Sequence, residues 1–161
     1  MDVRQLANQI IRPTLAYVGD GLPGFATEAA VRLLLGTAAV ESELHYLAQV
    51  PTGPAQGIYQ IEPATAEDIH NSFLRYRLAL RSRVMELAAA HPVEAQQLAS
   101  NLAYATAIAR LVYWRSPLKL PAEDDIEGMA AMWKQVFNTS LGAGEPAKFV
   151  EAYRRLIQPK L

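Results

Sequence analysis

The sequence of 161 residues contains no cysteine. That absence excludes a disulfide framework, a thiolate zinc site and a cysteine nucleophile, but it does not fix the compartment, because such a chain tolerates oxidising and reducing surroundings alike. Net charge is also nearly absent, since 15 basic and 16 acidic residues leave a formal charge of −1. This balance argues against a protein that binds nucleic acid or a membrane surface.

Long apolar runs are missing too. The longest covers residues 29–40 and carries Arg32, whereas a membrane-spanning helix needs roughly 20 apolar residues. Residues 1–9, MDVRQLANQ, lack the basic segment and following apolar segment of a secretory signal. We therefore expect no membrane span and no signal peptide.

Apolar residues make up 51% of the chain, so a sizeable buried core is expected. Their spacing is helical almost throughout, and prolines and glycines separate the helical patterns. Helices are expected over about 3–11, 26–44, 75–90, 93–115 and 123–137. His91-Pro92 divides the helix over 75–90 from the helix over 93–115. Two further helices are expected to begin near Pro63, with Thr65 as N-cap, and at Pro146. The prediction is a single all-α domain spanning residues 1–161, with about seven helices.

The most informative single residue is Glu41. It ends the apolar run within the helix expected over 26–44 and is followed by Ser42. A carboxyl group in such a place loses contact with water, which raises its pKa and lets it act as a general acid near neutral pH. The alternative is a helix-end glutamate that faces solvent, and this alternative is favoured for a glutamate considered alone.

Three further motifs follow Glu41-Ser42 in order: residues 57–66, which read GIYQIEPATA, then Asn101-Leu102, then Phe137-Asn138. The ordered set resembles the soluble lytic transglycosylase and goose-type lysozyme group, over roughly residues 26–140. That family shows a Glu-Ser pair, a Gly-Leu-Met-Gln-Leu-x-Pro-x-Thr string, an Asn-Leu helix and a Tyr-Asn pair. Each motif alone is weak, and the ordered set is specific.

The resemblance implies a lysozyme-like fold and cleavage of peptidoglycan without a metal or other cofactor. Glu41 would protonate the β-1,4 glycosidic oxygen between N-acetylmuramic acid and N-acetylglucosamine. It would then take a proton from the muramic C6 hydroxyl, so that a 1,6-anhydro ring closes. The stretch 133–144 looks like that of a tailed-phage member. Such a protein would act on periplasmic peptidoglycan from a virion or the host cytoplasm, with glycan strands and other virion proteins as partners.

Most glycoside hydrolases need a second carboxylate beside the scissile bond, and the sequence offers no obvious one. Glu43 points away from Glu41 on a helix, and Val50 stands where the tailed-phage endolysin type has an aspartate. Glu62 and Asp68 come later, and Asp68 is explained as a helix N-terminal residue. This pattern fits a single-acid mechanism assisted by the substrate's acetamido group. Hydrolysis stays open, because loops can bring a remote carboxylate close.

Further candidates for the substrate site surround Glu41 in the motifs: Ser42, Gly57, Tyr59, Gln60, Phe137 and Asn138. Gly57 permits close backbone approach, and Gln60 offers a donor and an acceptor to a sugar amide. Tyr59 either stacks on a sugar ring or is buried by the alternating pattern of residues 58–61.

The family gives three of these residues a role. Ser42 would form a hydrogen bond near the glutamate, although helix termination explains it equally well. Phe137 replaces the tyrosine whose hydroxyl contacts the catalytic carboxyl in the family, so the pKa of Glu41 would depend more on burial. Asn138 would contact substrate, or would simply end a helix.

Other residues point to competing functions. His45, His70 and His91 show no metal-binding spacing, and the basic stretch 75–83 is typical of a solvated helix face. One alternative is a catalytically weak virion or glycan-binding protein of the same fold, motivated by Phe137 and the missing second acid. Another is a helical DNA-packaging or tail adaptor, against which the near-neutral charge counts.

Overall fold

The computed structural model describes residues 1–88, 94–138 and 142–161. In these ranges the chain is helical, with isolated β-bridges and no strand, so the all-α prediction is confirmed. No helix in the described ranges is long and apolar enough to cross a membrane. The α-helices are α1 (Val3–Gln5), α2 (Arg12–Val18), α3 (Glu28–Ser42), α4 (Pro63–Asp68), α5 (Leu78–Leu87), α6 (Glu94–Ser100), α7 (Leu102–Trp114), α8 (Ile126–Met132) and α9 (Pro146–Ala152).

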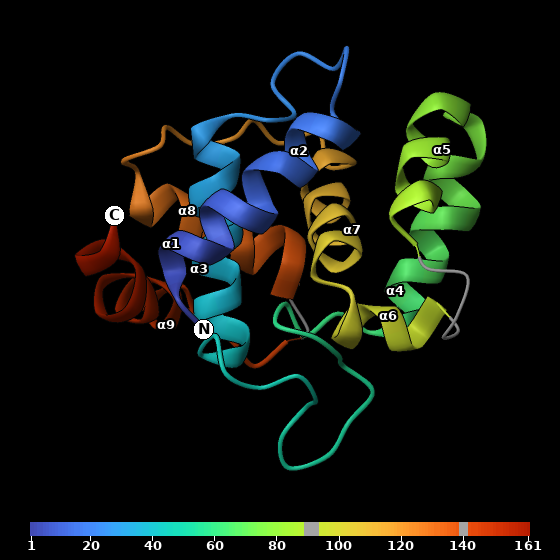
Figure 1. The fold of residues 1–161 in the computed structure, drawn as a ribbon. Coiled ribbons are helices and arrows are strands. Elements are labelled where there is room, and N and C mark those ends of the chain that lie inside the picture. The colour runs from blue at the N-terminus through green and yellow to red at the C-terminus, as the bar shows by residue number, and fades with distance from the viewer. Residues whose placement is uncertain (89–93, 139–141) are drawn as a thin grey trace.

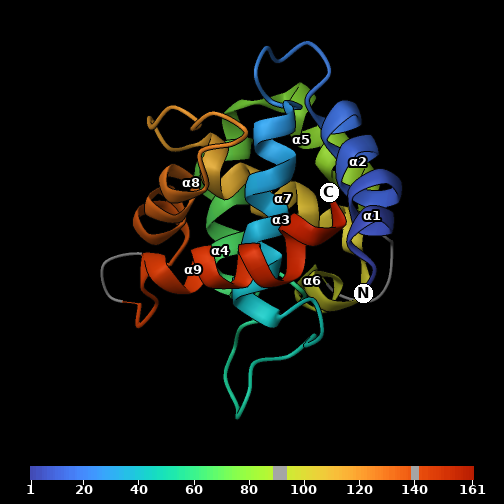
Figure 2. The same cartoon turned by 90° about the vertical axis from the view of Figure 1, so that its left-hand side faces the viewer.

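Helices α3 and α7 form the centre of the molecule. Helices α1 and α2 pack on one side of this pair, α8 and α9 lie on another, and α5 lies beyond α7 (Figure 1; Figure 2). Residues 104–113 of α7 are buried without interruption. A helix that is apolar nearly all round must be enclosed by others, which is why these two sequences occupy the core.

Both ends of α3 follow from local chemistry. The Thr27 hydroxyl accepts a hydrogen bond of 3.2 Å from the Ala30 N–H and caps the first turn. At the other end Glu43 and Leu44 adopt left-handed backbone conformations, with φ of 53° and 58°, so the helix ends at Ser42. Residue 41 therefore lies in the last turn of a buried helix.

The single helix predicted over 93–115 is wrong in one respect. The chain leaves helical geometry at Asn101, whose side chain accepts from the Tyr104 N–H at 3.0 Å and donates to the Leu87 carbonyl at 2.7 Å. An asparagine that can cap a new helix competes with helix continuation, which separates α6 from α7. The predicted division at His91-Pro92 lies outside the described residues.

Two other helix starts differ from prediction. Thr65 is not the N-cap of α4, because the helix already begins at Pro63 with Glu62 in the capping position. Proline fits the first helical turn, where its missing N–H has no partner to lose. Helix α8 begins later than the sequence predicts, because the Asp125 side chain caps it by accepting a backbone N–H of the first turn.

The loop of residues 43–62 extends from one end of the helical body (Figure 1). Backbone hydrogen bonds fix its base, since Gln56 and Ile61 exchange N–H···O contacts of 3.0 Å. The Gly57 N–H also donates to the Leu47 carbonyl at 2.9 Å. The prediction that residues 50–57 form turns rather than helix is confirmed, and the loop supplies one wall of a cleft at the end of α3.

Candidate active site

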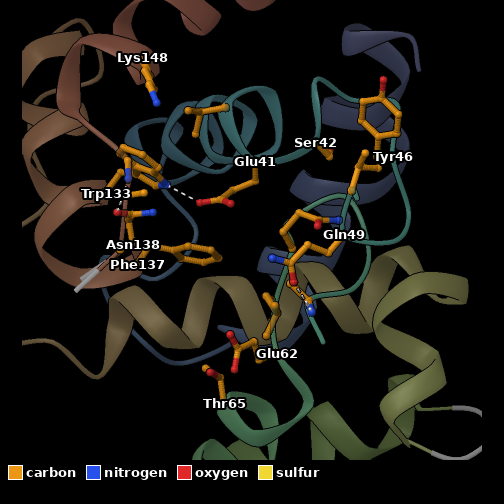
Figure 3. Close-up of a pocket in the computed structure, with 18 of the residues that line it drawn as sticks. Glu41, Ser42, Tyr46, Gln49, Glu62, Thr65, Trp133, Phe137, Asn138 and Lys148 are labelled. Carbon is orange, nitrogen blue, oxygen red and sulfur yellow. Dashed lines mark hydrogen bonds between the residues drawn. The ribbon is translucent and has the colours of Figure 1, made fainter. Parts of the chain in front are cut away.

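A cleft of about 930 Å³ opens at the C-terminal end of α3 (Figure 3). Its walls come from the loop 43–62, the start of α4, α7, the π-helical turn Trp133–Asn138 and α9. The fold brings together predicted site residues from distant parts of the chain, namely Glu41, Ser42, Gln60, Phe137 and Asn138. Two predicted residues, Gly57 and Tyr59, do not line the cleft.

Glu41 lines this cleft and is partly buried. Burial removes water from its carboxyl group and raises its pKa from 4.5 to about 7, although a hydrogen bond from Trp133 opposes part of that rise. The indole Nε1 donates to Oε1 of Glu41 at 2.8 Å, and Figure 3 shows this contact as a dashed line. A carboxyl group in this state is partly protonated at neutral pH, so it can both donate and accept a proton.

Trp133 is the residue that sequence analysis missed. It is 2% exposed, and its single N–H donor finds Glu41 as its partner. Phe137 follows it by one helical turn, and both side chains line the cleft. The spacing of Trp133 and Phe137 could have indicated this role, because residues four positions apart share a helix face and Phe137 was already a predicted site residue.

Phe137 forms an apolar wall beside Glu41 (Figure 3). Its ring stacks on Tyr113 with a centroid separation of 5.4 Å. The Tyr113 hydroxyl is engaged with the Thr37 hydroxyl at 2.8 Å, and burial together with the nearby Glu41 charge raises the Tyr113 pKa well above its usual value. The carboxyl therefore has an indole donor from Trp133, while its pKa is set mainly by burial.

Asn138 is held in a fixed orientation on the same wall. Its Oδ1 accepts from the Lys134 ammonium at 2.9 Å and from the Gly144 N–H at 3.2 Å. Lys134 also donates to the Gly142 carbonyl at 2.7 Å, so its ammonium group links Asn138 to Gly142. With Oδ1 engaged, the amide nitrogen of Asn138 is left to face the cleft (Figure 3).

Ser42 lines the cleft and holds the end of α3 against the loop. It is 1% exposed, and its hydroxyl lies 2.7 Å from the Ile58 carbonyl and 3.1 Å from the Ala38 carbonyl. The first contact joins the last turn of α3 to the loop that carries Gln60. The hydroxyl therefore has a positioning role, and its predicted contact with substrate stays a prediction.

Gly57 allows a close backbone approach, as predicted, but the approach is to α6. Its φ is +74°, and a Cβ atom there would lie 1.8 Å from the Leu98 carbonyl oxygen. Gln60 also has a left-handed backbone, with φ of 47°, and its Nε2 donates to the Gly57 carbonyl at 2.8 Å. This internal hydrogen bond fixes the Gln60 side chain where it lines the cleft.

Tyr59 does not stack on a sugar, because it is completely buried and its hydroxyl pairs with Thr106 at 3.1 Å. The alternating pattern of residues 58–61 therefore places Tyr59 in the core, which is the second of the two predicted outcomes. The exposed aromatic residue of the cleft is Tyr46, which lies on the loop at its rim and is 46% exposed.

The other carboxylates near Glu41 differ in how they are used. Glu43 points outward and pairs with Arg155 at 3.1 Å. Asp68 is exposed and pairs with Arg115 at 2.5 Å, and that contact lowers the Asp68 pKa. Glu62 lines the cleft wall opposite Glu41 (Figure 3). Across the described part of the chain, no group of three or more acidic or histidine side chains is arranged to hold a metal ion.

Comparisons of this chain with protein-family models, with curated proteins and with solved structures found no match.

Proposed function

We propose that this protein is a peptidoglycan-cleaving lytic transglycosylase of lysozyme-like fold, with Glu41 as its single acid and base. The observation that carries the proposal is the partial burial of Glu41 in a large cleft, where loss of water raises its pKa to about 7. The ordered motifs that resemble this family supply the substrate class. A phage-encoded protein that acts in cell-wall penetration or lysis is part of the same proposal.

The reaction divides into two proton transfers at one carboxyl group. Protonated Glu41 gives its proton to the glycosidic oxygen as the bond from C1 of N-acetylmuramic acid breaks. The acetamido oxygen of the same sugar stabilises the positive charge that develops at C1. The Glu41 carboxylate then takes the proton of the C6 hydroxyl, O6 bonds to C1, and a 1,6-anhydro ring closes. Glu41 ends protonated, and no water is consumed.

The remaining cleft residues bind the glycan strand. Tyr46 offers an aromatic face at the rim, and the side chains of Gln60 and Asn138 offer amide groups inside the cleft. Both amides are held by hydrogen bonds to their own loops. Polar groups fixed before substrate arrives lose less conformational freedom on binding.

A hydrolytic muramidase is the second candidate, and Glu62 is the observation that favours it. This carboxylate is exposed on the cleft wall across from Glu41 and makes no ion pair within the described residues. A carboxylate in that position could activate a water molecule on the opposite face of the sugar, as inverting enzymes do.

Digestion of purified murein, followed by mass spectrometry of the products, tests the proposal. The expected products of the wild-type protein carry 1,6-anhydro ends, and Glu41→Gln reduces turnover at least a thousandfold. Glu62→Gln keeps most of the activity in a transglycosylase. Reducing ends instead of anhydro ends, together with loss of activity in Glu62→Gln, would leave a muramidase.

A third outcome identifies a binding protein. No turnover of murein by the wild-type protein, with measurable binding of glycan oligomers, would replace the enzyme with a glycan-binding virion protein. Full activity in Glu41→Gln would refute the assignment of Glu41.

A further inference from the structure

Lys148 is a cation on the wall of the cleft with no protein partner in the described part of the chain. It lies on α9, is exposed, and lines the same cleft as Glu41. Within those ranges no carboxylate or carbonyl pairs with its ammonium group. Figure 3 shows the amine directed toward the side of the cleft that holds Trp133.

The neighbouring cations are already engaged. The Lys134 ammonium donates to the Asn138 side chain and the Gly142 carbonyl, so it holds the turn rather than facing a ligand. Arg155 pairs with Glu43 on the outer surface. Lys148 is therefore the positive group that the described cleft offers to a ligand.

The same wall presents donors. Two hydrogen bonds occupy Oδ1 of Asn138, so its NH₂ group faces the cleft on the other side of Trp133 from Lys148 (Figure 3). An ammonium group and an amide NH₂ both match an acceptor, and a charged acceptor gains most from the ammonium. Elsewhere the cleft is lined by the carboxyl groups of Glu41 and Glu62, and an ionised carboxyl group repels an anion.

We propose that Lys148 binds a carboxylate of the glycan strand and so selects muramyl strands over neutral chitin. The proposal rests on the proposed function, because it assigns a substrate class to the same cleft. A muramic residue carries a lactyl ether that N-acetylglucosamine lacks. The lactyl carboxylate is free in strands without peptides. In strands that bear peptides, the peptide supplies carboxylates instead. The site therefore places the muramic residue on the α9 side of Glu41.

Binding measurements in the Glu41→Gln background separate this site from turnover. Three probes are used: a neutral chito-oligosaccharide, a peptide-free muramyl oligosaccharide and a peptide-bearing one. Lys148→Gln is expected to weaken binding of the muramyl probes roughly threefold to tenfold, with a smaller loss at high salt, and to leave the neutral probe unchanged. Lys148→Arg should retain the affinity, and Lys119→Gln, at an exposed position outside the cleft, is the matched control.

The probes also identify the source of the carboxylate. If Lys148→Gln weakens binding of both muramyl probes, the lactyl and peptide carboxylates are interchangeable ligands. If it weakens binding of only one probe, the carboxylate of that probe is the ligand. Equal weakening of all three probes, or no weakening in Lys148→Gln, overturns the anion site. Murein cleavage by the wild-type protein is measured separately. If the wild-type protein cleaves murein but Lys148→Gln binds the muramyl probes normally, only the carboxylate site is refuted. If Lys148→Gln weakens binding of the muramyl probes but the wild-type protein does not cleave murein, only the proposed catalysis is refuted.

Discussion

The indole Nε1 of Trp133 donates a hydrogen bond of 2.8 Å to Oε1 of Glu41, and the two residues lie 92 positions apart in the chain. This donor favours the ionised carboxyl, whereas burial favours the protonated one, and burial has the larger effect. Trp133 thereby fixes one oxygen of Glu41 while leaving its pKa near 7. The pair gives the carboxyl both an orientation and a protonation state suited to acid catalysis.

Replacing Trp133 by phenylalanine should change the pH profile as well as the rate. Without the indole donor the Glu41 pKa rises further, so the alkaline limb of kcat/KM on murein moves to higher pH. The carboxyl also loses its fixed orientation, and kcat is expected to fall roughly tenfold to a hundredfold. The measurement is kcat/KM over a range of pH, with Trp114→Phe as a control at a tryptophan that does not line the cleft. An unmoved alkaline limb would contradict the positioning role.

Glu41 should also make folding stability depend on pH. Below pH 4.5 the carboxyl is protonated in both folded and unfolded states and has no effect. Between pH 4.5 and about 7 the unfolded chain ionises first, so stability falls as pH rises, by up to about 3 kcal/mol. Glu41→Gln removes this loss and can still accept from Trp133, so its advantage over wild type should grow through that interval and then level off.

Urea unfolding of both proteins at several pH values measures this difference. Glu67→Gln on the exposed side of α4 is the control, since surface substitutions change stability by roughly 0.5 kcal/mol or less. A constant difference between Glu41→Gln and wild type across the interval would show that residue 41 is not desolvated in solution.

The sequence predicts the elements whose cause is local. The apolar run of α3 must be buried, and this follows from residues 29–40 alone, whereas the sequence favours burial of Glu41 only when residues 57–66 are considered with it. The turn-forming prolines and glycines of residues 50–57 likewise exclude a helix there. These predictions hold because the deciding interactions lie within a few residues of one another.

The predictions that failed depend on contacts between distant segments or on competing local caps. Nothing near Glu41 in the sequence indicates Trp133, because the contact exists only once the π-helical turn Trp133–Asn138 meets the last turn of α3. The burial of Tyr59 follows from α7, which supplies the Thr106 partner. At Asn101 the local signals conflicted, since the apolar spacing continues through the residue while its side chain caps a new helix.

Gly57 provides a test of the loop's attachment to the helical body. Gly57→Ala combines a positive φ with a Cβ that would lie 1.8 Å from the Leu98 carbonyl oxygen. Gly21 has nearly the same φ, +76°, but open space around it, so Gly21→Ala isolates the backbone term of roughly 1–2 kcal/mol. Gly57→Ala should cost a further 1–3 kcal/mol or so from overpacking. Urea unfolding measures both, and equal losses would show that α6 moves aside at no cost.

Tyr46 and Tyr59 should separate substrate binding from stability. Tyr46→Ala removes the exposed ring at the cleft rim and is expected to weaken glycan binding roughly threefold to tenfold, with little effect on unfolding. Tyr59→Phe removes the buried hydroxyl that pairs with Thr106, so it should cost about 1 kcal/mol of stability and leave affinity unchanged. Tyr76→Ala, at a ring that is 74% exposed outside the cleft, is the control. Titration with glycan oligomers and urea unfolding are run on all three variants, and weaker binding in Tyr59→Phe without a loss of stability would contradict the assignment of its ring to the core.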